Sequence, residues 1–420
     1  MIRGGPLPRF RLYTRPALYA EVARELASPG RGEEAWRQLE AAIAARTGLP
    51  HALCVPRARA GIYLALSSLI EPGQKVILSP YTIHEVVNMV VCAGGVPVFA
   101  DVERHTCNLD PRAARDLLDG ETGAVLVTHL HGLAADLEGL AATCRERGVA
   151  LVEDCAQALG TRLHGRPVGS FGDAGILSFG TYKNATSFLG GMLVTPHARV
   201  RERAEARLAE WPLQPLGPWL REAGLALATD LVTWPPLFRH LTFPLFRYGY
   251  LHDVELLNKR VRVEDDPRLR REYPEAWSVR MRPAQARMAL GQLAGVERDG
   301  STRAAFARRY HEGLADLPDL LLPPLREDGS HTYSYYPIQF ADRHALVRFL
   351  MQRGCDLAVQ HLRNCADLPC FADFRRDCPN ARATASATVL LPTYPRYGQR
   401  DVARNVAAIR AFFGRGSGGA

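Results

Sequence analysis

Two residues that each follow an apolar run, a lysine and an aspartate, have the types needed for chemistry on carbonyl compounds. Lys183 lies in DAGILSFGTYKNATSFLGG, which begins at Asp173, and Asp154 lies in LVEDCAQALG, which begins at Leu151. Burial beside apolar neighbours lowers the pKa of an amine and makes it a nucleophile for carbonyls. A buried carboxylate is costly unless a cation or hydrogen-bond donors meet it, and Gln157 follows closely enough to orient it. The pair therefore indicates a site that binds a carbonyl compound.

A pyridoxal phosphate site requires the same two residue types, a lysine for the aldehyde and an aspartate that keeps the pyridine nitrogen protonated. It also requires a phosphate cradle. The segment RARAGIYLAL, from Arg57, begins a helix after an apolar run, so its backbone N–H groups can point at a phosphate. Arg59 could add a charge-assisted contact. Because a lysine and an aspartate near strand ends also occur by chance, an ordinary exposed lysine stays open as an alternative.

Short apolar runs that alternate with helix-like segments would position these residues. Most runs are apolar on both faces, as buried parallel strands are, and the alternation predicts an α/β doubly wound domain with crossover connections. The seven runs are HALCV from His51, KVILSP from Lys75, VPVFAD from Val96, AVLVTHL from Ala124, ALVEDC from Ala150, AGILSFG from Ala174 and GMLVT from Gly191. Ligands of such folds bind beyond the carboxyl ends of the strands. The strand-end residues are Pro80, Asp101, His131, Asp154 and the segment from Ser178 to Lys183.

The chain changes character after Val200. A segment rich in Pro, Trp, Phe and Leu begins at Trp211. Its prolines and the charged residues Asp230 and Arg239 interrupt the apolar sequence, so it cannot span a membrane. We expect an insertion packed on the body or on a second subunit, with a lid or a membrane-surface patch as alternatives. The tail beyond Ser330 mixes β runs with helices. The expected domains are 1–200, a large domain that binds the cofactor; 201–277, an apolar helical insertion or lid; and 278–420, a connecting helix and a small α+β domain.

The composition is that of an ordinary globular protein, with 47% hydrophobic and 23% charged residues in 420. The net charge of +8 is scattered, which suits an anionic small substrate and gives little support to nucleic-acid binding. Irregularly spaced cysteines and an N-terminus without an apolar signal region favour a cytoplasmic location. The spacing of His361, Cys365, Cys370 and Cys378 matches no zinc pattern, so we expect no metal site there.

The sequence resembles the DegT/StrS-type family of pyridoxal-phosphate-dependent sugar aminotransferases. The motifs that carry the resemblance are PYTIHEVVNMV, AGGVPVFADVE, THLHGLAADLEGL, VEDCAQALG, GRPVGSFGDAG, ILSFGTYKN, LGGMLVT, RMRPAQARMALGQL and LLPTYPRY, in that order. They cover nearly the whole chain apart from the insertion. The resemblance implies a type I aminotransferase fold with a mostly parallel seven-stranded large domain, a smaller C-terminal domain, and a homodimer with active sites at the interface.

The resemblance also implies roles for single residues. Lys183 matches the lysine that links covalently to the cofactor and moves protons, and Asp154 matches the partner of the pyridine nitrogen. Gln157 matches the group beside the cofactor ring, and Ser178 matches the serine that reaches the phosphate. Relatives with a histidine in place of the lysine are dehydratases, so Lys183 argues against that branch.

At three positions, Arg59, Ser278 and Ile83, the chain departs from the family pattern. Ala58 and Arg59 fall where the family usually has a Gly-Thr or Ala-Thr phosphate turn, so charge could replace a hydroxyl here. Ser278 replaces an asparagine that reaches the phosphate from the partner subunit, and its shorter side chain leaves that contact in doubt. Ile83 replaces an aromatic residue over the pyridine ring, which leaves His84 as the other candidate for stacking.

The implied activity is transfer of an amino group from an amino acid, expected to be glutamate, to a nucleotide-linked keto sugar. Such a reaction serves amino-sugar biosynthesis for surface polysaccharides or secondary metabolites. The apolar insertion favours an alternative, a lipid-linked or otherwise hydrophobic keto substrate used during peripheral membrane contact through residues 211–252. A regulator that binds pyridoxal phosphate without turnover is a further hypothesis.

Overall fold

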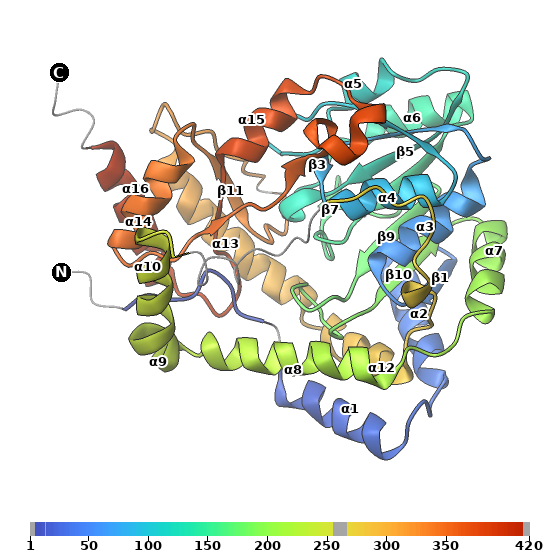
Figure 1. Cartoon of the computed structure of the whole chain (residues 1–420), viewed down its shortest axis with the longest axis horizontal. Helices are drawn as coiled ribbons and strands as arrows, with labels where there is room; N and C mark the ends of the chain where they lie inside the picture. Colours follow the sequence, from blue (N-terminus) through green and yellow to red (C-terminus); the bar gives the residue numbers. More distant parts are fainter. Residues whose placement is uncertain (1–4, 13, 255–266, 327, 415–420) are drawn as a thin grey trace.

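A seven-stranded sheet forms the centre of the computed structural model, which describes residues 5–12, 14–254, 267–326 and 328–414 (Figure 1). Its strands, in spatial order, are β1 (His51–Val55), β10 (Gly191–Thr195), β9 (Ala174–Ser178), β6 (Ala150–Asp154), β5 (Thr122–Thr128), β2 (Lys75–Leu78) and β4 (Val96–Phe99). Only β10 among these seven runs antiparallel to its neighbours. The seven runs predicted from the sequence are these strands, and the mostly parallel α/β fold is confirmed.

Helices cover both faces of this sheet, which explains why its strands are apolar on both sides. One apolar core joins the sheet to α2 (Glu34–Thr47), α6 (Glu138–Arg147) and α12 (Pro283–Leu293). The other core joins it to α3 (Ala58–Leu69), α4 (His84–Cys92) and α7 (Ala198–Ala209). This arrangement leaves the carboxyl ends of the parallel strands free of helices that would block a ligand.

A smaller antiparallel sheet lies in the C-terminal part, in the order β11 (Tyr336–Gln339), β14 (Thr388–Leu391) and β12 (Ala358–Val359). Three helices enclose its core: α13 (Val296–Leu314), α14 (Arg343–Gln352) and α16 (Gln399–Phe413). The predicted α+β character of the C-terminal region is confirmed. Of the predicted β run HTYSYYPIQF, only the last part is a strand, because Thr332 instead bonds the backbone of Gly132.

A two-residue strand ties the C-terminal region to the large sheet. Strand β13 (Arg363–Asn364) pairs antiparallel with β3 (Tyr81–Thr82), which directly follows β2. The N–H of Cys365 also donates to the carbonyl of Pro80 at 2.7 Å. One wall of the region beyond the large sheet therefore comes from residues near the end of the chain.

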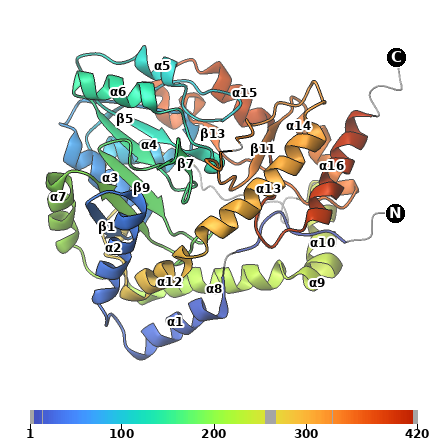
Figure 2. The same ribbon diagram turned by 180° about the vertical axis from the view of Figure 1, so that it is seen from behind.

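The insertion predicted from composition contains helices between residues 216 and 251, and its residues 255–266 lie outside the described part of the chain. Its elements are α8 (Leu216–Val232), α9 (Pro235–Leu237), a short π-helical turn (Phe238–Thr242) and α10 (Phe243–Leu251). Helix α8 runs along the lower edge of the molecule above α1 (Pro16–Ala27), and α10 lies beside α14; the reverse view agrees (Figures 1 and 2). Trp219, which is 0% exposed, packs with Leu18, Phe188 and Met288. Its indole N–H donates to the carbonyl of Ser187 at 3.2 Å, so α8 is anchored on the body.

This anchoring predicts unequal effects for two tryptophans of the same insertion. Trp219→Ala should lower the free energy of unfolding by about 3–5 kcal/mol, because a large buried side chain leaves a cavity. Trp234→Ala should change it by less than about 0.5 kcal/mol, since Trp234 is 55% exposed. Chemical denaturation followed by circular dichroism measures both. Equal stability of the two variants would contradict the packing of α8.

Candidate active site

Lys183 lies on the loop that follows β9, at the carboxyl end of the large sheet. Its backbone N–H donates to the carbonyl of Gly180 at 3.1 Å, which closes a tight turn after Ser178. Burial lowers the pKa of Lys183; the charge of Asp154 opposes this shift, and the nearby Arg59 adds to it. A lower pKa leaves more of the amine unprotonated near neutral pH, as a nucleophile requires.

Asp154 ends β6, the strand next to β9, so the two side chains lie at adjoining strand ends. It is only 4% exposed, and burial raises its pKa. The N–H of Ala156, which donates to Oδ1 at 3.0 Å, opposes that shift, as does the charge of Lys183. The carboxylate therefore gains from a further cation. A protonated ring nitrogen is such a cation.

Ser178, Ala58 and the first turn of α3 are close neighbours. Ser178 pairs with Gly191 across the β9–β10 ladder, and a Cβ at Gly191 would lie 2.9 Å from the backbone nitrogen of Ala58. Only glycine allows this approach. Gly190 has a φ of +133°, which also requires glycine. Helix α3 has no acidic residue in its first turn and no side-chain cap, so its first N–H groups can donate to an anion.

Arg59 lies in that first turn, and its Cζ is 4.7 Å from the indole centroid of Trp277. Ser278 follows Trp277 and is partly exposed, and its N–H donates to the carbonyl of Glu275 at 2.9 Å. The residue that contacts Arg59 is therefore Trp277, and not the neighbouring Ser278 that the family resemblance indicated. His84 Nε2 lies 3.4 Å from Glu85 Oε1, and stacking by His84 stays a prediction.

Gln157 orients the neighbouring backbone. Its Oε1 accepts from the N–H of His131 at 3.0 Å, which leaves its amide N–H groups to donate elsewhere. His131 is 0% exposed, has a left-handed φ of 57°, and both ring nitrogens lack a hydrogen-bond partner among the described residues. Burial, and then His361, lower the pKa of His131 to about 3, so its ring is neutral. Burial and the charge of Lys183 lower the pKa of His361 in turn.

These residues fit pyridoxal phosphate. Unpartnered buried nitrogens at His131 and at Arg57 Nε show that polar groups here lack a ligand within the described residues. The donors at the start of α3 and the hydroxyl of Ser178 suit a phosphate, and Asp154 suits a protonated ring nitrogen. The amine of Lys183 suits the aldehyde of such a cofactor.

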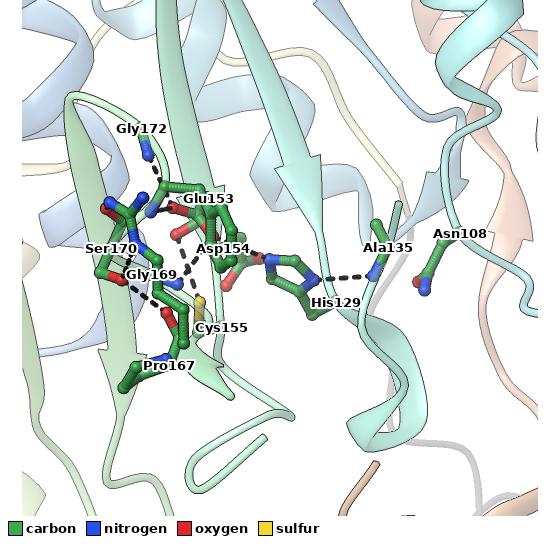
Figure 3. Close-up of polar contacts among 12 residues, drawn as sticks. Asn108, His129, Ala135, Glu153, Asp154, Cys155, Pro167, Gly169, Ser170 and Gly172 are labelled. Carbon is green, nitrogen blue, oxygen red and sulfur yellow. Dashed lines mark hydrogen bonds and ion pairs between the residues drawn. The ribbon is translucent and has the colours of Figure 1, made fainter. Parts of the chain in front are cut away.

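A buried hydrogen-bond network fixes the strand end that carries Asp154 (Figure 3). Glu153 Oε1 accepts from the N–H groups of Phe171 at 2.6 Å and Gly172 at 2.9 Å, and Oε2 accepts from Gly169 at 2.7 Å. His129 Nε2 lies 3.2 Å from Oε2, while His129 Nδ1 accepts from the N–H of Ala135 at 3.0 Å. Nδ1 therefore carries no proton, and Nε2 donates to Glu153.

The same network argues against a metal at this place. Ligand atoms of His129, Glu153 and Cys155 lie within 4.8 Å of one another. Both oxygens of Glu153 already accept backbone N–H donors, and both nitrogens of His129 are engaged, so the group is a structural hydrogen-bond cluster.

Three parts of this region were missed from the sequence: the Glu153 network, Arg57, and Trp277. The pair of arginines in RARAG and the tryptophan before Ser278 were visible signals. What the sequence could not show is that Trp277 returns to the start of α3.

The fold, with a lysine and an aspartate at adjoining strand ends, is that of a type I aminotransferase. The chain belongs to the DegT/DnrJ/EryC1/StrS aminotransferase family, whose model matches residues 23–224 and 254–410. The family resemblance read from the motifs is thereby confirmed, and the chain is a transaminase of a pyridoxal-phosphate-dependent family.

Similar proteins agree with this assignment. The chain is 29% identical over 377 residues to UDP-N-acetyl-3-dehydro-alpha-D-glucosamine 3-aminotransferase of Acidithiobacillus ferrooxidans, covering 89% of this chain and 87% of that protein. It is 26% identical to the spore coat polysaccharide biosynthesis protein SpsC of Bacillus subtilis, covering 89% and 88%. An aminotransferase structure from Psychrobacter cryohalolentis has the same fold, with a TM-score of 0.77, 22% identity and coverage of 97% and 99%.

The Glu153 network predicts that Glu153→Gln destabilises the protein. The amide NH₂ would face backbone N–H donors, and each donor left without an acceptor costs about 1–3 kcal/mol. Thermal unfolding should show a clear fall in Tm. Glu146→Gln, at an exposed position on α6, is the matched control and should leave Tm nearly unchanged. A Glu153→Gln protein as stable as the control would disprove the structural role of the network.

Proposed function

We propose that this transaminase uses pyridoxal phosphate bound at Lys183 and moves an amino group from glutamate to a nucleotide-linked keto sugar. The observation that carries the proposal is the electrostatic pairing of Lys183 and Asp154 at the ends of adjacent buried strands. Other groups then have defined tasks: Ala58, Arg59 and Ser178 bind the phosphate, and Gln157 lies beside the ring. A contribution from Ser278 of a second copy in a homodimer belongs to the same proposal.

When bound, pyridoxal phosphate supplies an aldehyde for the amine and a protonated ring that accepts electrons from the substrate carbon. Asp154 stabilises the positive charge on the ring nitrogen, and it does so strongly because it is buried. Lys183 Nζ takes the proton from the α-carbon of the amino donor. In the second half of the transfer, it gives a proton to the former keto carbon of the acceptor. Its lowered pKa suits both tasks.

A recess beside Lys183 supports an anionic substrate. It is small, with about 40 Å³ of free space, and its lining includes Tyr182 and Asn184, the two neighbours of Lys183 in sequence. Arg11 and Arg303 line it. Guanidinium groups suit the carboxylate of glutamate or the diphosphate of a sugar nucleotide. The UDP-sugar aminotransferase among the relatives supports the nucleotide-linked acceptor.

Reduction with borohydride tests the cofactor and its attachment point. The sequence has three lysines, Lys75, Lys183 and Lys259. Only the peptide with Lys183 should carry the reduced cofactor. Lys75 is the internal control, since hydrogen bonds to Asp119 and Glu121 raise its pKa and reduce its nucleophilicity. An unmodified Lys183 peptide in the cofactor-saturated protein would refute the proposal.

Substitution tests the catalytic role. Lys183→Ala should reduce transamination to the background rate, because Lys75, the other lysine in the described part of the chain, begins β2 at the opposite end of the sheet. Lys75→Ala should keep normal turnover. Mass spectrometry of a panel of keto-sugar nucleotides incubated with glutamate measures amino transfer and identifies the acceptor. Substantial turnover by Lys183→Ala would contradict the assignment. If the wild type removes no amino group from glutamate, the protein would instead be a regulator that binds the cofactor without turnover.

A specific observation favours a second candidate, a hydrophobic or lipid-linked keto substrate reached at a membrane surface. Among the described residues, the exposed large hydrophobic side chains other than Leu26, Val96 and Tyr182 all lie on the insertion: Leu225, Leu227, Leu231, Val232, Trp234, Leu241, Leu245 and Tyr248. Exposed basic residues accompany them: Arg221, Arg239, His240 and Arg247. This combination suits an anionic lipid surface. Among the described residues, no helix is long and apolar enough to cross a bilayer.

Vesicle sedimentation tests this candidate. The protein should bind vesicles that contain phosphatidylglycerol, and Leu231→Glu with Trp234→Glu should weaken binding at least about tenfold, because charges replace apolar contacts. Leu26→Glu, an exposed leucine outside the insertion, is the control. If the wild-type protein does not sediment with the vesicles, a role of the insertion at a membrane surface would be ruled out. Loss of self-association in the double variant would instead identify a second copy as the occupant.

A further inference from the structure

Three guanidinium groups surround the indole of Trp277. The Cζ atoms of Arg57, Arg59 and Arg270 lie 5.0, 4.7 and 5.6 Å from its ring centroid. Contacts of this kind between arginine and tryptophan are attractive, and they hold the planar guanidinium in a defined orientation. Two of these arginines, Arg57 and Arg59, begin α3, where the N–H groups of the first turn can donate to an anion.

Aromatic stacking ties Trp277 to the same helix. The ring of Tyr273 stacks on Tyr63 of α3 with centroids 4.2 Å apart and planes 19° apart, and on Trp211 at 5.4 Å and 9°. The rings of Tyr273 and Trp277 are 76° from parallel, with centroids 6.2 Å apart. The hydroxyl of Tyr273 donates to the backbone carbonyl of Trp277 at 3.2 Å. Because Tyr63 lies on the helix that Arg57 and Arg59 begin, Trp277 is held in place relative to both arginines.

Arg270 and Arg57 of this cluster differ in their partners. Arg270 pairs with Glu85 at 3.1 Å. Arg57 Nε is buried without a partner among the described residues, and burial followed by the repulsion of Arg59 lowers the pKa of Arg57 to about 10. Glu222 gives Arg57 only a partial compensation. Two like charges held together at a helix N-terminus are stabilised by a bound dianion.

We propose that Arg57 and Arg59, held against Trp277, form a clamp for the phosphate of pyridoxal phosphate that lies within one chain. This arginine clamp takes the place of the small hydroxyl that the family resemblance implies at Arg59, and it adds to the contact proposed for Ser278 of a second copy. Trp277 is a positioning residue, since it acts through the arginines. The inference rests on the proposed function, because it concerns the same cofactor.

The consequence is a preference for the phosphorylated cofactor that depends on charge. Each arginine provides charge-assisted hydrogen bonds, which are the strong class, and Arg59 can bind phosphate in a bidentate manner. Pyridoxal, which lacks the phosphate, does not use the clamp. The ratio of the dissociation constants for pyridoxal and pyridoxal phosphate therefore isolates the contribution of the clamp from that of Lys183.

Equilibrium titration of both ligands, followed by absorbance, tests the arginines. Arg57→Ala and Arg59→Ala should each lower that ratio by about 10- to 100-fold, as expected for loss of a hydrogen bond between charged groups. Pyridoxal affinity should stay within about twofold of the wild-type value. Arg270→Ala is the matched control, because this arginine touches the same indole but is paired with Glu85. It should keep the wild-type ratio within about twofold.

Substitution of the tryptophan tests the positioning role. Trp277→Ala should lower the ratio, and Trp277→Phe should restore much of it, because a ring again supports the guanidinium groups. Inorganic phosphate alone should change the tryptophan fluorescence of the wild type, and Trp277→Phe should abolish that change. If Arg59→Ala fails to fold by circular dichroism, Arg59→Gln replaces it with a neutral side chain of similar length.

The outcomes separate the clamp from the proposed function. A borohydride-stable adduct at Lys183 together with an unchanged ratio in Arg57→Ala, Arg59→Ala and Trp277→Ala would overturn the clamp and leave the function standing. No adduct in the wild type would overturn the function itself. A lowered ratio in both arginine variants, with a normal Arg270→Ala control, supports the clamp. If phosphate does not change the tryptophan fluorescence of the wild type, the result would count against the clamp.

Discussion

The pairing of two opposite charges at adjoining strand ends, with Asp154 buried and Lys183 partly buried, is the constraint on which this structure depends. Low exposure drives Lys183 and Asp154 toward their neutral forms, and each partly restores the charge of the other. Such a pair works only if the separation of the strands is fixed, since the interaction between charges in a poorly solvated place changes steeply with distance. The parallel pairing of β6 with β9 provides that fixed separation.

The backbone around Asp154 is held by a second buried carboxylate that does no chemistry. Glu153 alternates with Asp154 along β6, so the two side chains point to opposite faces. On its face, Glu153 binds the loop that leads into β9 and the histidine that follows β5. The ends of three strands are thereby joined behind the site. This explains how a carboxylate can be buried without a cation: hydrogen-bond donors surround it.

Much of the fold could be predicted because its signals are local. Seven apolar runs gave seven strands, and the helices between them followed from ordinary stop signals. The reversed direction of β10 could not be predicted, because a run that is apolar on both faces carries no information about direction. Within the candidate site, Lys183 and Asp154 were found from their strand-end positions. Their functional roles still rest on the family resemblance and on the proposal above.

The contacts that escaped prediction are those between distant segments. Arg59 and Trp277 are more than two hundred residues apart, and their meeting depends on the path of the chain after the apolar insertion. No composition or period encodes that path. The same holds for His131, whose ring nitrogens have no hydrogen-bond partner in the described part of the chain and whose N–H donates to Gln157 Oε1, 26 positions away.

The pairing of β13 with β3 has a consequence for how the molecule is made. The thiol of Cys365 donates to the carbonyl of Thr82, a contact that spans 283 positions in the chain. Residues 81 and 82 leave the ribosome long before residues 363 and 364, with which they pair, are synthesised. Until then β3 has an unpaired edge, the kind of surface that invites association with other chains. This wall is therefore completed only after residue 364 has been synthesised, and chains that terminate before that residue would expose the edge of β3.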